Sequence, residues 1–131
     1  MMQGIPQTFN KKPRRFVWEY RSNQGEPLGY VVRFDDDGKN KEIVPYFKRI
    51  NGNGWQHGSA TEPRPLFGLD VLNKANNERS VFIVEGEKSA AALQSLGLVA
   101  ITSQGGSNSA LKTDWKPLNE RERIYMLPDN E

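Results

Sequence analysis

The stretch Val81-Phe82-Ile83-Val84-Glu85-Gly86-Glu87-Lys88 decides the fold of this chain. Its first four residues form a continuous apolar run, which is typical of a strand buried on both faces of a parallel sheet. The following residues, 88 to 96, are rich in alanine and end at Gly97, so they predict a helix with a glycine stop. A buried strand that leads into a helix indicates an α/β unit.

The same alternation continues toward the C-terminus. The sequence predicts a strand over 98–102, a glycine-rich loop over 103–109, a short helix over 114–120 and a third strand over 123–127. Strands and helices that alternate in this way predict a small, doubly wound α/β domain with a parallel sheet and right-handed crossovers.

The preceding half of the chain has a different pattern. Short β-rich runs are separated by Asn-, Asp- and Gly-containing turn sequences, which predicts an antiparallel meander. We therefore expect an α+β chain in three parts. These are a flexible basic arm (1–15), a β-rich region (16–79) with strands over 16–20, 28–34 and 42–49, and the α/β domain (80–131). Residues 66–72 fit a short strand or a helical turn, and residues 73–79 a polar linker.

Composition excludes several classes of protein. The 131 residues carry a formal charge of +2, include no cysteine and only one histidine, so disulfide frameworks and zinc sites of thiolate or histidine type are excluded. No apolar stretch approaches the roughly 20 residues of a membrane span, and we expect a soluble, cytoplasmic protein. Residues 1–79 hold 13 Lys and Arg against 9 Asp and Glu, and residues 80–131 hold 5 against 7. This asymmetry suits a polyanion on the first part and a metal on the second, although on charge alone a margin this small favours a mixed solvated surface.

Acidic side chains follow two of the predicted strands. Glu85 and Glu87 come after the first strand, and Asp129 and Glu131 come after the third. Functional groups of α/β sheets gather beyond the carboxyl ends of the strands, where neighbouring carboxylates repel unless a cation lies between them. Mg²⁺, or Mn²⁺ in its place, suits such oxygen ligands together with a substrate phosphate. The alternative is that these acids are solvated loop residues.

The ordered set VFIVEGEKSAAAL, TSQGGSNS, DWKPL and IYMLPDNE resembles the TOPRIM domain, in particular that of primases and primase-helicases of phages, plasmids and integrated elements. The resemblance implies a metal-site or acid/base role for Glu85, and metal ligation by Asp129. Glu131 stands where the family pattern has aspartate, which puts full activity in doubt. The resemblance also implies a single-stranded DNA template and nucleotides as ligands, and a helicase domain or partner.

Because TOPRIM sheets continue past the second acidic motif, the resemblance implies a C-terminally incomplete domain with an open sheet edge. We therefore expect self-association.

Three further features could contact phosphate or nucleic acid. Glu87 and Lys88 belong to the Glu-Gly-Glu-Lys variant of the motif, and Lys88 could bind phosphate or be a plain surface lysine. Gly105, Gly106 and Ser107 could form an anion-binding nest or a simple turn. Basic residues lie among aromatics in the first half, a pattern that suits single strands, although half of these aromatics should face a core. The basic candidates are Arg14, Arg15, Arg33, Lys48 and Arg49.

The leading hypothesis is therefore a Mg²⁺-dependent part of a DNA primase that synthesises RNA primers on single-stranded DNA, with Glu85, Lys88, Asp129 and Glu131 at its catalytic site. Two alternatives remain open at the level of sequence. One is a non-catalytic module that binds single-stranded nucleic acid on a TOPRIM scaffold, and the other is a TOPRIM nuclease.

Overall fold

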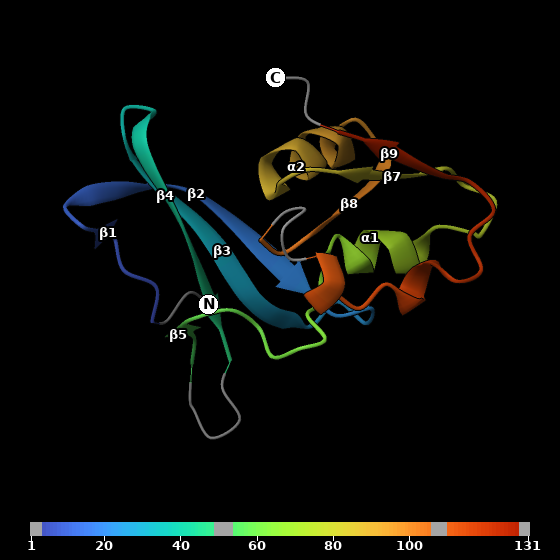
Figure 1. Cartoon of the computed structure of the whole chain (residues 1–131), viewed down its shortest axis with the longest axis horizontal. Coiled ribbons are helices and arrows are strands. Elements are labelled where there is room, and N and C mark those ends of the chain that lie inside the picture. Colours follow the sequence, from blue (N-terminus) through green and yellow to red (C-terminus); the bar gives the residue numbers. More distant parts are fainter. Residues whose placement is uncertain (1–3, 49–53, 106–109, 129–131) are drawn as a thin grey trace.

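Two β-sheets and two helices make up the chain in a computed structural model that describes residues 4–48, 54–105 and 110–128. A five-stranded antiparallel sheet lies on one side, and a four-stranded, mostly parallel sheet with the helices lies on the other (Figure 1). The protein is thus a mixed α+β structure, as the sequence predicts.

The first sheet has the strand order β1-β2-β3-β4-β5 and all its pairs are antiparallel. Its hairpin turn at Asp37-Gly38 has positive φ at both residues, 51° and 85°, which is the backbone that suits the twist of a tight hairpin. The predicted meander is confirmed. The strands are β1 (Thr8–Phe9), β2 (Lys12–Arg21), β3 (Pro27–Asp36), β4 (Lys39–Phe47) and β5 (Gln56–His57).

The prediction of a flexible arm over residues 1–15 is wrong for its second half. Thr8 pairs with Pro13 across β1 and β2, and β2 begins at Lys12. Lys12 also contacts β4, where its Nζ lies 2.9 Å from Glu42 Oε2. The basic residues near the N-terminus therefore extend a strand that the sequence predicts only from Phe16.

The two faces of the first sheet pack in different directions. One face holds a cluster around Tyr30, Val32 and Phe34, and the other joins Trp18 and Tyr20 to residues of the second sheet. Along each strand, successive side chains point alternately to these two faces, and a bulge in β2 interrupts this alternation. Arg14 pairs with Phe34 and Phe16 pairs with Arg33, so residues 14 and 16 lie on opposite faces.

The second sheet has the order β6-β8-β7-β9, with β6 antiparallel to β8 and the other pairs parallel. Residues 66–74 supply both a strand and a helix, where the sequence left the choice open. Because β6 pairs with β8, the second sheet includes residues 66–67, which precede the domain boundary expected at residue 80. Its elements are β6 (Leu66–Phe67), α1 (Leu69–Lys74), β7 (Val81–Val84), α2 (Glu87–Ser95), β8 (Val99–Ser103), the 3₁₀ helix η2 (Lys116–Leu118) and β9 (Ile124–Leu127).

Both faces of this sheet are covered, as the continuous apolar runs predict. Val84 and Ala100 pack with α2 and the first sheet, whereas Val81, Val99 and Ile101 pack with α1 and the segment that contains Trp115 and Leu118. The central position of β7 therefore explains why four consecutive residues of this strand are apolar.

The C-terminal strand β9 is an edge strand. It pairs only with β7 in the sheet order, and its four side chains are exposed, Met126 at 73% of its surface. None of the helices in the described part of the chain combines the length and apolar character that a membrane crossing requires.

Candidate functional site

The turn that follows β7 directs two acidic side chains to different places. Gly86 adopts φ +95° and caps the N-terminus of α2, a backbone that favours glycine. On one side of this glycine, Glu85 is exposed, and on the other side Glu87 is buried with 8% of its surface accessible. The Glu-Gly-Glu sequence therefore provides one accessible carboxylate and one internal carboxylate.

Glu87 is engaged by the first sheet. The hydroxyl of Tyr20, a fully buried residue of β2, donates a hydrogen bond of 2.6 Å to Glu87 Oε2. Burial raises the pKa of Glu87, and the hydrogen bond from Tyr20 opposes that rise. The pKa of the Tyr20 hydroxyl is raised well above its usual value by burial and by the adjacent carboxylate. Predicted from sequence as a metal ligand, Glu87 thus has a partner in the protein.

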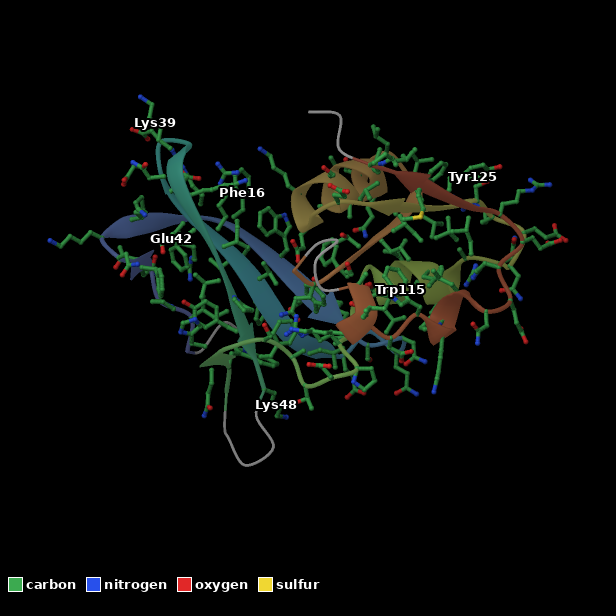
Figure 2. All side chains as sticks on the ribbon, in the orientation of Figure 1. Phe16, Lys39, Glu42, Lys48, Trp115 and Tyr125 are labelled. Carbon is green, nitrogen blue, oxygen red and sulfur yellow. The ribbon has the colours of Figure 1, made fainter. Side chains whose placement is uncertain are left out.

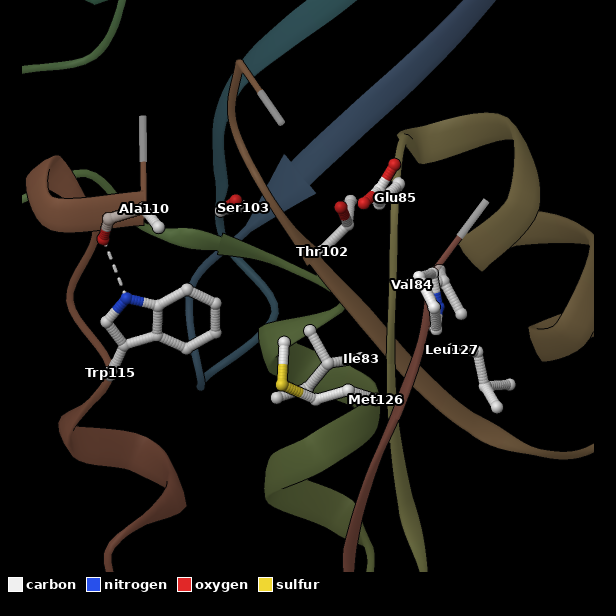
Figure 3. A pocket seen from close by; sticks show the side chains of 10 residues that line it. Ile83, Val84, Glu85, Thr102, Ser103, Ala110, Trp115, Met126 and Leu127 are labelled. Atoms are coloured by element: carbon white, nitrogen blue, oxygen red, sulfur yellow. Dashed lines mark hydrogen bonds between the residues drawn. The ribbon is translucent and has the colours of Figure 1, made fainter. Parts of the chain in front are cut away.

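Glu85 lies at a cavity of about 350 Å³ at the carboxyl ends of β7, β8 and β9 (Figure 3). Apolar residues such as Ile83 and Met126 form much of its wall, and Trp115 closes one side with its indole N–H bonded to the Ala110 carbonyl at 2.7 Å. Asp114 Oδ1 accepts a hydrogen bond of 3.1 Å from the Lys116 amide, where η2 begins. An exposed carboxylate beside an apolar cavity is accessible to a cation or to a substrate.

Three buried polar residues at the end of β8 complete this edge of the sheet. Thr102, Ser103 and Gln104 are 1%, 7% and 3% exposed. Thr102 Oγ1 accepts a hydrogen bond of 3.1 Å from the Gly86 amide, so it fixes the turn that carries Glu85. Sequence reasoning did not select Thr102 and Gln104 as site residues. The available signal was a polar run that directly follows the apolar strand.

Lys88 lies in the first turn of α2 and is exposed. Its ammonium group is 5.3 Å from the centroid of the Phe16 ring of β2, a cation–π distance. Lys88 therefore reaches across to the first sheet.

A second cavity, of about 500 Å³, lies between the two sheets. Its walls include Ile43 from β4 and Gln104 and Gly105 from the loop after β8. Arg64 also lines it, and among the described side chains the Arg64 Nε is buried without a hydrogen-bond partner. Glu87 faces the same cavity. This inter-sheet cavity, with Gly105 at its wall, adjoins the end of β8 as the Glu85 cavity does.

Some candidates lie outside the described residues. These are Asp129, Glu131, Gly106, Ser107 and Arg49. Within the described ranges, no group of three or more acidic or histidine side chains is arranged to hold a metal ion.

Two of the basic candidates meet at one buried carboxylate. Arg15 Nε lies 3.0 Å from Asp35 Oδ1 and Arg33 Nε lies 2.7 Å from Asp35 Oδ2. Burial alone would raise the pKa of Asp35, but the Gly38 amide, Arg33 and Arg15 together lower it to about 2. Arg15 also contacts Asp37 at 2.8 Å. These arginines are therefore ordered by acidic neighbours of the same hairpin.

The five basic candidates do not form one surface. Arg14 lies on the opposite face of the first sheet from Arg33, because of the β2 bulge. Lys48 follows β4 at the end of the sheet opposite Phe16, as Figure 2 shows. Only Arg15 and Arg33 share a partner in the described part of the chain.

Comparison with solved structures finds bacteriophage T7 primases. The primase fragment of the T7 primase-helicase protein aligns with 95% of this chain at a TM-score of 0.61 and 22% identity. A chain from the structure of T7 lagging-strand DNA polymerase interacting with primase domains of two gp4 subunits, bound to an RNA/DNA hybrid and dTTP, aligns with 92% at 0.59 and 21% identity. The sequence matches no protein-family model and no curated protein.

These likenesses show that the chain shares the fold of a phage primase fragment. The match spans about half of each T7 chain, 46% and 48% of their lengths.

Proposed function

We propose that this chain is the TOPRIM-containing part of a DNA primase, which joins ribonucleotides on a single-stranded DNA template in the replication of a phage, plasmid or integrated element. The observation that carries the proposal is the accessible Glu85 at the carboxyl end of the central strand β7, beside a cavity, in a fold shared with the T7 primase fragment. The exposed Glu85 is the carboxylate of the pair that is free to meet a substrate phosphate through a cation.

The register of the second sheet supports a shared metal site. Val84 pairs with Leu127 between the parallel strands β7 and β9, so Glu85 and Pro128, which follow them, lie at the same edge of the sheet. We propose that Glu85, Asp129 and Glu131 hold Mg²⁺, or Mn²⁺, at this edge. When bound, the ion would neutralise charge on the reacting phosphate and orient the attacking oxygen.

The remaining residues have positioning roles in this proposal. Thr102 holds the Gly86 amide and so fixes the turn that presents Glu85. Glu87 is not among the proposed metal ligands because its carboxylate accepts the Tyr20 hydrogen bond, and it instead anchors α2 to the first sheet. Arg64 and Gly105 line the inter-sheet cavity, and we propose that Arg64 Nε, buried without a hydrogen-bond partner among the described side chains, donates there to an incoming phosphate.

A primer-synthesis assay tests the proposal. We would measure incorporation of labelled ribonucleotides on single-stranded DNA with Mg²⁺, with EDTA, and with the variant Glu85→Gln. Glu120→Gln, an exposed acid of the segment after η2, is the matched control. We expect EDTA and Glu85→Gln to reduce incorporation at least 100-fold, as for removal of a group that orients a metal-bound phosphate, and the control to keep full activity. Synthesis that survives Glu85→Gln would refute the assignment.

A second candidate is binding of single-stranded nucleic acid without catalysis. It is favoured by the Tyr20–Glu87 hydrogen bond, which leaves a single accessible carboxylate in the Glu-Gly-Glu turn. In this case binding would depend on salt but not on Mg²⁺ or Glu85. A TOPRIM nuclease is separated from both by product analysis, because it would shorten the template strand.

A further inference from the structure

Three rows of side chains cross the first sheet on the face that looks toward the second sheet. Each row joins residues that are paired across β2, β3 and β4. The inner row is Tyr20, Gly29 and Phe47, the middle row is Trp18, Val31 and Pro45, and the outer row is Phe16, Arg33 and Ile43.

Burial falls steadily from the inner row to the outer row. Tyr20 and Phe47 are 0% and 2% exposed because α2 and the second sheet cover them. In the outer row, Phe16 is 41% exposed and Ile43 is 46% exposed. The outer row therefore presents two large apolar side chains with an arginine between them, beyond the area that the second sheet covers.

Phe16 is held in a defined orientation despite this exposure. Its ring stacks on Trp18 with 5.7 Å between centroids and 8° between planes, and Trp18 is itself buried. Lys88 of α2 brings its ammonium group to 5.3 Å from the Phe16 centroid. The position of Phe16 beside α2 can be followed in Figure 2. An exposed ring backed by a buried indole is a firm surface for stacking.

We propose that the outer row binds a single-stranded nucleic acid, with one base stacked on Phe16 and the adjacent phosphate bound by Lys88. The Lys88 side chain is exposed, so its ammonium group can leave the ring when a base arrives and pair with the phosphate of that nucleotide. The inference rests on the proposed function, whose template strand it assigns to this face.

The surroundings of the outer row favour this occupant. A base needs a π-face, and its phosphate needs a cation a few ångströms away, and Phe16 with Lys88 supplies this combination. Arg33 adds a guanidinium that Asp35 orients through Nε. Ile43 belongs both to the outer row and to the wall of the inter-sheet cavity of about 500 Å³, so a nucleic-acid strand bound along this row would point toward that cavity.

The test is binding of a fluorescent twelve-residue oligothymidylate, followed by anisotropy in EDTA so that no metal site contributes. We expect Phe16→Ala to weaken binding about tenfold, the effect of losing one stacked base, and Phe16→Tyr to bind like the wild type. Leu96→Ala, which removes an exposed apolar side chain at the C-terminal end of α2, is the control and should not change binding. Equal affinity of the wild type and Phe16→Ala would overturn the proposal.

A second oligomer separates stacking from charge. An abasic strand of the same length has the same phosphates but no rings, so the wild type should prefer oligothymidylate by about tenfold. Phe16→Leu keeps an apolar side chain at the site and should lose most of this preference. If Phe16→Ala fails to fold, the Leu variant and the wild-type preference still decide, and a wild type without any preference refutes stacking.

The outcome is independent of catalysis. Glu85→Gln should bind oligothymidylate as tightly as the wild type, since Glu85 lies at the other cavity. Failure of primer synthesis with intact Phe16-dependent binding would reject the proposed enzyme and keep the surface. Intact synthesis with binding that ignores Phe16 would reject the surface and keep the enzyme.

Discussion

Tyr20 and Glu87 connect the two sheets through one buried hydrogen bond. They are 67 positions apart in the sequence, yet the Tyr20 hydroxyl lies 2.6 Å from Glu87 Oε2. Tyr20 belongs to the long strand β2 and Glu87 to the first turn of α2. The bond therefore fixes the position of α2, and with it the adjacent Glu85 turn, relative to the first sheet.

Removing the hydroxyl should destabilise the protein. Tyr20→Phe leaves the buried Glu87 carboxylate without its donor, and we expect the free energy of unfolding in urea to fall by about 2 kcal/mol, the magnitude for a hydrogen bond to a buried charge. Tyr125→Phe, on the exposed strand β9, is the control and should change it by less than about 0.5 kcal/mol. If Tyr20→Phe left the free energy of unfolding unchanged, Glu87 would have to accept a hydrogen bond from another donor.

Asp35 should make the stability of the first sheet depend on acid pH. Its pKa is lowered to about 2 in the fold, against about 3.9 for an unperturbed aspartate. A group with a lowered pKa stabilises the folded state above its unfolded pKa, so this contribution is complete at pH 5 and is lost as the pH falls from about 4 to about 2. Urea unfolding of the wild type and Asp35→Asn between pH 2 and 7 measures the effect.

The free energies of unfolding of the wild type and Asp35→Asn should differ most at neutral pH and converge near pH 2. Asp36→Asn, an exposed neighbour in the same hairpin, is the control. A difference between wild type and Asp35→Asn that stays constant over this pH range would contradict the role of the Asp35 carboxylate.

Gly29 should resist substitution because of Phe47. A Cβ at Gly29 would lie 2.3 Å from Cδ1 of the Phe47 ring, closer than any real contact. We expect Gly29→Ala to destabilise the protein by about 1 to 3 kcal/mol through overpacking, measured by urea unfolding.

A double-mutant cycle identifies the cause. Combining Gly29→Ala with Phe47→Leu should cost less than the sum of the single changes, because the smaller side chain leaves room for the new methyl group. Strict additivity would show that the glycine is needed for another reason.

The exposed edge strand β9 should mediate association. Among the strands that the structure describes, none pairs with its outer backbone edge, and this edge with its exposed apolar side chains is a site for strand pairing between copies. We expect the molecular mass by light scattering to rise with protein concentration, and Met126→Lys to suppress the rise. Leu96→Lys, the same kind of change at an exposed apolar residue at the end of α2, is the control and should leave the rise unchanged. A wild type that stays monomeric at millimolar concentration would contradict this prediction.

Local sequence patterns predicted the order of elements well. The alternation around 81–103 and the Asp37-Gly38 turn are encoded by neighbouring residues, through apolar runs, glycine stops and turn chemistry. Gly97 illustrates this, since it ends α2 with φ +86° and its amide binds the Gln94 carbonyl. Such features need no knowledge of the rest of the chain.

The features that sequence missed depend on distant partners. β2 starts at Lys12, which pairs with β1 and contacts Glu42 of β4. The acidic residue Glu87 is buried and accepts a hydrogen bond from Tyr20 of β2. Arg15 and Arg33 read as phosphate ligands in the sequence but converge on Asp35. Three of these contacts, Lys12–Glu42, Tyr20–Glu87 and Arg15–Asp35, join residues 20 or more positions apart, which no local pattern encodes. The fourth, Arg33–Asp35, joins residues two positions apart on β3.

The bulge in β2 makes Arg15 a position that the strand can lose without reversing its faces. Deleting Arg15 would make Arg14 and Phe16 consecutive residues of a regular strand, which still places them on opposite faces, across from Phe34 and Arg33. Phe16 would stay in the outer row, and Trp18 and Tyr20 would stay in the core. Across natural variants, single-residue insertions and deletions should therefore be absent between residues 16 and 20, where they would turn side chains to the wrong face, whereas residue 15 can be lost together with its ion pairs to Asp35 and Asp37.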